Sequence, residues 1–129
     1  MSAPAWASAN VSCRIDDAFL SLELEAIAGR TGPITQVNVG KISIKPTARF
    51  ELAGPDVSFD RSHIVQQWIV GEDMRLQIEI GGDRQTVNLT VLARFDEARD
   101  KYFGRYVLTL SRPGATKELK GRIKECEAG

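Results

Sequence analysis

Residues 74–95 read MRLQIEIGGDRQTVNLTVLARF, and apolar and polar side chains alternate through both halves of this stretch. Alternation with a period of two is typical of a β-strand that has one buried face and one wet face. The two halves are separated by GGDR, in which glycine supplies the positive φ angle that a tight hairpin turn requires. The stretch therefore predicts a β-hairpin in an antiparallel sheet with its core on one side.

The same alternation occurs on both sides of this hairpin, in FLSLELEAI (residues 19–27) and in KYFGRYVLTLS (residues 101–111). The loops DEARDK and RPGAT have the composition of hairpin connections. Residues 74–126 therefore predict a four-stranded meander. The first half is less regular. Its apolar residues change from odd-numbered to even-numbered positions near Gly40, where we expect a β-bulge. The segment ARFEL (residues 48–52) predicts a further strand.

The segment HIVQQWIV (residues 63–70) fits two structures. As a helix it has apolar i,i+4 pairs, and Asp60 could cap it. As a strand it has four β-branched residues and a hairpin connection through GED, and we favour the strand because eight residues are short for a helix. The chain then contains eight or nine strands and at most one short helix. This count predicts an all-β fold, either a single small antiparallel β-barrel or a β-sandwich.

A chain of 129 residues is long enough for one domain, which we place at residues 10–129. Residues 1–9, MSAPAWASA, differ in character and end in the small-x-small pattern Ala7-Ser8-Ala9, which predicts a flexible leader or the remnant of a signal peptide. The 17 basic residues are balanced by 17 acidic ones, so the chain lacks the cationic surplus of a non-specific nucleic-acid or anionic-membrane binder. No apolar run has the length of a membrane span.

The two cysteines, Cys13 and Cys126, lie near opposite ends of the chain, and we expect them to form a disulfide in a periplasmic or secreted protein. The alternative is two free thiols in a cytoplasmic protein. Strand alternation places Cys13 on an apolar face, but it places Cys126 on the face of Lys120, Arg122 and Lys124. Side chains on opposite faces cannot reach disulfide distance without a kink, so we expect a bulge near Gly121 or a position beyond the regular ladder.

Groups that could perform catalysis are few. His63 is the only histidine, and the cysteines and histidine lack the spacing of a zinc site. The sequence contains neither a G-x-S-x-G nucleophile motif nor a phosphate-binding glycine loop. We therefore expect no enzyme activity, no cofactor and no metal.

Cationic and large amphipathic side chains are the candidates for binding. If the later strands are neighbours, the outward cations form a stripe suited to an acidic partner; these are Arg75, Arg94, Arg105, Lys120, Arg122 and Lys124. Alternation places Trp68 and Gln66 on the face of Ile64, where the glutamine would need a polar partner or an opening. The tyrosines fall on an apolar face and could equally be core. The candidate binding residues are Trp68, Gln66, His63, Tyr102, Tyr106, Arg105, Arg122 and Lys124.

The segments VGEDMRLQIEI, VNLTVLARF and YFGRYVL are similar to the C-terminal half of PilZ domains, which are β-barrels that bind cyclic di-GMP. The resemblance implies a β-barrel. The R-x-x-x-R and D/N-x-S-x-x-G motifs with which that family holds the nucleotide do not occur here. In Ile42-Ser43-Ile44, which we compared with the second motif, both the acid or amide before the serine and the glycine after it are missing. Binding of the dinucleotide is therefore not implied.

Two functional hypotheses follow from these residues. The first is a small exported β-domain that binds another protein as an inhibitor-like or accessory module. The second is a lipocalin-like barrel that carries a small apolar ligand in its interior. A core filled by aliphatic side chains argues against the second hypothesis, whereas a pocket beside Trp68 and Gln66 favours it.

Overall fold

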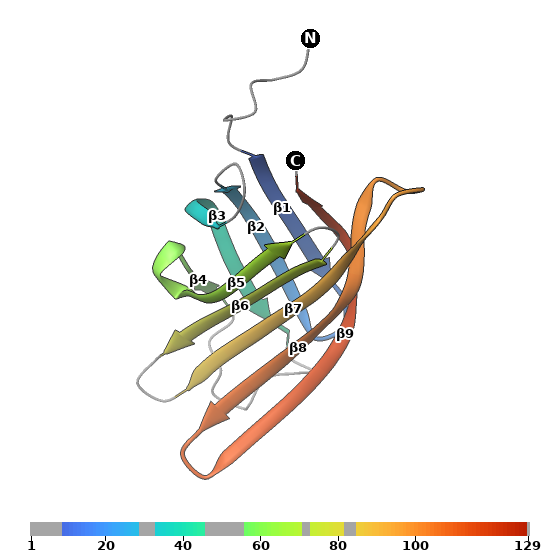
Figure 1. Ribbon diagram of the computed structural model, residues 1–129. Helices are drawn as coiled ribbons and strands as arrows, with labels where there is room; N and C mark the ends of the chain where they lie inside the picture. The colour runs from blue at the N-terminus through green and yellow to red at the C-terminus, as the bar shows by residue number, and fades with distance from the viewer. Residues whose placement is uncertain (1–8, 29–32, 46–55, 71–72, 82–84, 129) are drawn as a thin grey trace.

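The structure is a computed structural model that describes residues 9–28, 33–45, 56–70, 73–81 and 85–128. The strands are β1 (Ala9–Asp16), β2 (Leu20–Ala28), β3 (Ile34–Ile44), β4 (Asp56–Ser58), β5 (Ile64–Val70), β6 (Asp73–Gly81), β7 (Thr86–Asp96), β8 (Lys101–Arg112) and β9 (Ala115–Ala128). They form one antiparallel sheet in the order β4-β3-β2-β1-β9-β8-β7-β6-β5. The sheet curls into a nearly closed barrel (Figure 1), which confirms the predicted all-β fold and selects the barrel.

The predicted four-stranded meander is present as β6 to β9, with full ladders between consecutive strands. At the β7–β8 hairpin, the Asp96 carboxylate accepts hydrogen bonds from the backbone N–H groups of Ala98 and Arg99. At the β8–β9 hairpin, Gly114 has a φ of +82°, a conformation that favours glycine. The composition of both loops therefore predicted the turns correctly.

β9 is the longest strand and joins the two walls of the barrel (Figure 1). It pairs with β8 along most of its length and, within the part of the chain that the structure describes, with β1 over four residue pairs near its end. Between Ile123 and Cys126 its ladder to β8 contains a bulge, opposite Tyr102 and Gly104. Because a bulge bends the strand that contains it, β9 can leave the wall of β5–β8 here and pair with β1.

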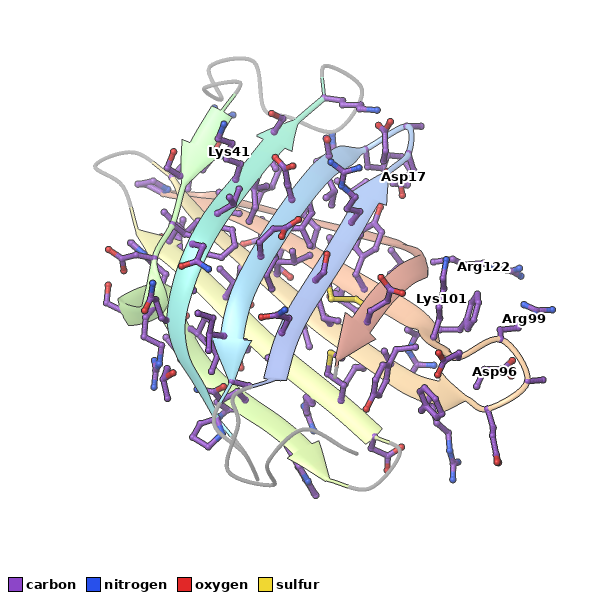
Figure 2. The ribbon with its side chains drawn as sticks, turned by 90° about the horizontal axis from the view of Figure 1, so that it is seen from above. Asp17, Lys41, Asp96, Arg99, Lys101 and Arg122 are labelled. Carbon is purple, nitrogen blue, oxygen red and sulfur yellow. A yellow bond between two sulfur atoms is a disulfide. The ribbon has the colours of Figure 1, made fainter. Side chains whose placement is uncertain are left out.

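The bulge also explains how the cysteines meet. Ile123 and Cys126 are both buried although their numbers differ in parity, so the side chains change face between them. Cys13 and Cys126 lie directly opposite each other on β1 and β9 and form a disulfide (Figure 2). The predicted pairing is confirmed, and the expected kink lies a few residues after Gly121. The disulfide ties the two walls together at their junction.

The interior of the barrel is filled by hydrophobic side chains from the inner face of the sheet. Buried and exposed positions alternate along β2, β6 and β7, as the sequence pattern predicts. Both tyrosines belong to this interior, since Tyr102 is 6% exposed and Tyr106 is fully buried. The tyrosine rings are therefore part of the core.

One bulge in β3 moves the inward-facing positions from even to odd numbers, and a second bulge moves them back. The β2–β3 ladder shifts register after Glu25 and again after Ile27, which leaves Asn38 and Thr35 as the extra residues. The predicted bulge at Gly40 is therefore misplaced by two residues. A Cβ atom at Gly40 would lie 2.4 Å from the Phe59 carbonyl oxygen, so glycine is required there for close approach. The predicted strand at 48–52 and the turn at 82–84 lie outside the described residues.

All of HIVQQWIV except His63 forms a strand, β5, and His63 ends the preceding turn of 3-10 helix, η1 (Arg61–His63). Asp60 caps this turn, because its carboxylate accepts a hydrogen bond from the backbone N–H of Ser62. In return, His63 Nδ1 accepts a hydrogen bond from the backbone N–H of Asp60. The only histidine therefore has a capping role in a turn.

The expected orientation of Trp68 and Gln66 is wrong. The β5–β6 ladder skips Val65, and this bulge reverses the facing of Gln66, Gln67 and Trp68. Ile64 is buried, whereas Gln66 and Trp68 both face solvent. The polar side chain that faces the seam of the barrel is that of Gln67.

Gln67 helps to close the barrel between β5 and β3, which no ladder joins among the described residues. Its side-chain amide accepts a hydrogen bond from the backbone N–H of Ile34 and donates one to the carbonyl of the same residue. Arg61 Nε donates to that carbonyl as well, over 2.7 Å. Two side chains thus replace the missing ladder at this seam.

Replacing Gln67 by alanine is expected to lower the free energy of unfolding by about 1–2 kcal/mol, because the backbone N–H of the buried Ile34 loses its hydrogen-bond acceptor. Gln66→Ala removes the neighbouring, outward-facing amide and is expected to change stability by less than about 0.5 kcal/mol. Urea unfolding compares the two variants, and hydrogen exchange at the Ile34 amide reports the seam directly. Equal effects of the two substitutions would contradict this closure.

Candidate functional site

A groove of about 730 Å³ lies on the outer face of β5–β9. One row of side chains crosses it, with one residue from each of these five neighbouring strands, and the ladder places each directly opposite the next. The row, which we call the arginine row, is Trp68, Arg75, Leu92, Arg105 and Arg122. All five side chains line the groove.

Strand alternation and register together build this row. Arg75 lies between the buried Met74 and Leu76, and Arg105 precedes the buried Tyr106, so both arginines face outward. Trp68 faces outward because of the bulge at Val65. The hairpin registers then align positions that are far apart in sequence.

The arginine row contains uncompensated positive charge. Among the described residues, no ion pair involves Arg75, Arg105 or Arg122. Arg105 and Arg122 are direct cross-strand neighbours, an arrangement in which like charges repel each other and destabilise the sheet. An anion between the two guanidinium groups would relieve this repulsion, so the row is suited to a negatively charged ligand.

The next row towards the β7–β8 hairpin consists of Asp73, Arg94 and Phe103. Arg94 forms an exposed ion pair with Asp73 over 3.8 Å. The guanidinium group of Arg99 lies over the Phe103 ring, 5.0 Å from its centroid. Arg99, Lys101 and Arg122 all point outward on this side of the barrel (Figure 2). This end of the face therefore combines cations with an aromatic ring.

The face becomes neutral and then acidic in the opposite direction along the strands. The neighbouring row is Gln66, Gln77, Thr90, Val107 and Lys120, and the row beyond it is Glu79, Asn88, Thr109 and Glu118. Lys120 forms an ion pair with Glu118 over 3.7 Å. A chain without net charge therefore presents a localised cationic groove.

The structure places the sequence-based candidates in three groups. Trp68, Arg105 and Arg122 share the arginine row, and Gln66 lies in the adjacent row. Tyr102, Tyr106 and His63 lie elsewhere, the tyrosines in the core and the histidine in η1. The side chain of Lys124 lies outside the described residues. Sequence reasoning missed Leu92 and Phe103, whose signal was an apolar residue at an outward position of an alternating strand.

A second cleft, of about 600 Å³, lies beside β1, β2 and Arg122. Three of the charged side chains that line it form ion pairs. Arg14 bonds Glu23 over 3.0 Å, and Lys45 bonds Asp16. Because these ion pairs already neutralise charges at the cleft within the protein, the groove is the stronger candidate for a binding site.

Beside the second cleft, the buried Tyr106 hydroxyl donates a hydrogen bond to the Asp17 carboxylate, which also accepts from the N–H groups of Phe19 and Leu20. Burial, together with the negative charge of Asp17, raises the pKa of Tyr106 well above its ordinary value of 10.0. Burial alone would raise the pKa of Asp17, but its hydrogen bonds hold that pKa below the ordinary value of 3.8. Folding therefore favours the neutral tyrosine and the ionised aspartate.

Tyr106→Phe is expected to lower the free energy of unfolding by about 1–3 kcal/mol near neutral pH, because it deletes a hydrogen bond to a carboxylate. The raised pKa of Tyr106 stabilises the fold below pH 10, and this contribution is lost as the pH rises further. The lowered pKa of Asp17 stabilises the fold above pH 3.8, and this contribution is lost at lower pH. Urea unfolding across pH should show that the free energy of unfolding decreases less steeply in the variant than in the wild type, both at high and at low pH. An unchanged pH profile would contradict this pairing.

Among the described residues, no three His, Cys, Asp or Glu side chains gather where they could hold a metal ion. The same residues include no helix long and apolar enough to cross a membrane. Comparison of the chain with protein-family models, with curated proteins and with solved structures finds no match. The function must therefore be inferred from the groove itself.

Proposed function

We propose that this protein is a small exported binding module that holds an acidic segment of another protein in the groove on the outer face of β5–β9. The arginine row supports this function, because it aligns three arginines that lack ion pairs within the described residues with an exposed tryptophan. Trp68 is 56% exposed, which is unusual for so large an apolar side chain. Tryptophan and arginine are also the residues most enriched at the energetic centres of protein interfaces.

Export to the periplasm or out of the cell is part of this proposal. The Cys13–Cys126 disulfide is compatible with an oxidising compartment. The pattern Ala7-Ser8-Ala9 supports the same location, since signal peptidases cleave after such residues. An accessory or inhibitor-like module would act there by occupying an acidic surface of its partner.

The alternative hypothesis, an apolar ligand inside the barrel, has less support. Aliphatic side chains from the inner faces of the strands pack against each other in the interior. The pocket beside Trp68 opens on the outer face, and arginines line it. This chemistry favours an anionic ligand over an apolar one.

Affinity capture from extracts of cells that make the protein tests the proposal. The bait is the wild-type protein, the Arg105→Glu variant or the Lys41→Glu variant. Lys41 is an exposed cation on β3, away from the groove (Figure 2). Both substitutions change the net charge by the same amount, so they separate the groove from overall charge.

A protein partner is expected on the wild-type and Lys41→Glu baits, and at least about tenfold less of it on Arg105→Glu. Circular dichroism and thermal unfolding confirm that each bait is folded. Equal retention by Arg105→Glu, or equal loss with Lys41→Glu, would overturn the proposed function.

A further inference from the structure

We propose that the ligand of the groove is an extended peptide segment of about six residues that lies across the strands. A carboxylate of this segment binds between Arg105 and Arg122, and an apolar side chain of the segment packs between Trp68 and Leu92. This inference rests on the proposed function and adds the class and orientation of the ligand.

The cross-strand pair at one end of the arginine row defines the site of the carboxylate. Arg105 and Arg122 are opposite each other in the β8–β9 ladder, and both are exposed on the same face. Directly opposite side chains on neighbouring strands lie close enough for two guanidinium groups to share one anion. The planar guanidinium group binds a carboxylate through two parallel hydrogen bonds, so this pair suits aspartate or glutamate.

The other end of the row defines the apolar contact. Trp68 is exposed on β5, and Leu92 is partly buried on β7, with Arg75 between them in the row. The tryptophan ring and the leucine side chain present apolar surface that the sheet itself leaves uncovered, and the aliphatic stem of Arg75 adds to it. An aliphatic or aromatic side chain of the ligand can bury this surface.

The charges on the rest of the face set the direction of the ligand. The row beyond the neutral one contains Glu79 and Glu118, so an acidic chain running along the strands would approach carboxylates. A chain that crosses the strands stays on the arginine row. Four steps between neighbouring strands span about 19 Å, which about six residues of extended chain cover.

The same charges favour a peptide over a single-stranded nucleic acid. A nucleic acid carries one phosphate per nucleotide and is held by a surplus of cations along its path. On this face the described arginines without an ion pair lie in one row and are interrupted by Leu92, and the chain has no net charge. The observed row matches a ligand with acidic and apolar groups at separate ends.

Peptide binding to the full-length protein tests this inference. The probes are a fluorescently labelled Phe-Gly-Ser-Gly-Glu-Glu peptide and its reversed sequence, both with blocked ends, because either chain direction could place the two groups correctly. The comparison probes replace both glutamates by glutamine, or replace the phenylalanine by alanine, and a thymidine oligonucleotide of similar length represents nucleic acid. Fluorescence anisotropy gives each dissociation constant.

One of the two acidic peptides is expected to bind about tenfold to a hundredfold more tightly than its glutamine analogue. Arg105→Glu and Trp68→Ala should each weaken this binding at least about tenfold, whereas Lys41→Glu should leave it unchanged. Equal affinity of the glutamine analogue, tighter binding of the oligonucleotide, or no binding of either peptide would overturn the inference. If capture of the native partner still depends on Arg105 in any of these cases, the ligand class is wrong and the proposed function stands.

Discussion

Replacing Cys13 and Cys126 together by serine is expected to lower the free energy of unfolding by about 5 kcal/mol. The disulfide spans 113 residues, so it removes much of the conformational freedom of the unfolded chain. In the folded chain it reinforces the β1–β9 ladder, which has four residue pairs among the residues described. Since small domains are stable by about 5–15 kcal/mol, a loss of this size is a large share of the total.

Urea unfolding of three samples measures this effect: the oxidised wild type, the reduced wild type and the double serine variant. The reduced wild type is expected to match the double variant, because both lack the same bond. A loss below about 1 kcal/mol in both samples would show that the β1–β9 junction does not depend on the disulfide.

Gly104→Ala is expected to destabilise the fold by about 3 kcal/mol, which is the second largest effect. A Cβ atom at this position would lie 1.9 Å from the Leu92 carbonyl oxygen and 2.7 Å from Ala93 Cα. Both atoms belong to the backbone of β7, so no side-chain rotation can relieve the overlap. Gly104 also lies opposite the bulge of β9, where the meander bends.

Gly81→Ala is the matched control, because a Cβ atom there meets no atom within 4 Å. It adds the same methyl group to a strand of the same sheet and is expected to change stability by less than about 0.5 kcal/mol. Thermal and urea unfolding compare the two variants. A stable Gly104→Ala protein would mean that β7 and β8 do not approach each other this closely.

The sequence pattern was most informative where the strands are regular. Alternation in residues 74–80, 86–95 and 101–111 identified three strands of the meander and their inner faces. It failed at bulges, because one extra residue reverses the facing of every later side chain. The bulge at Val65 has no glycine or proline to indicate it, so Trp68 and Gln66 were assigned to the wrong face. The bulge before Cys126 was anticipated only because a disulfide required it.

The candidate site could be predicted only in part. The sequence indicated outward cations on consecutive strands, including Arg75, Arg105 and Arg122. It could not indicate that Arg75, Leu92 and Arg105 align, because cross-strand alignment depends on where each hairpin turns and on the register that results. The face of the sheet on which Trp68 lies depends on a bulge that the sequence does not indicate. Its position opposite Arg75 is therefore known only from the folded sheet.

The fluorescence of Trp68 tests most directly whether the arginine row is the binding site. The chain has two tryptophans, so Trp6→Phe leaves Trp68 as the only one. Titration of this variant with the protein partner retained by the wild-type bait is expected to shift the emission to shorter wavelength as Trp68 becomes buried. Arg105→Glu in the same background should abolish the shift. Saturable binding of the partner with unchanged Trp68 emission would contradict the proposed site.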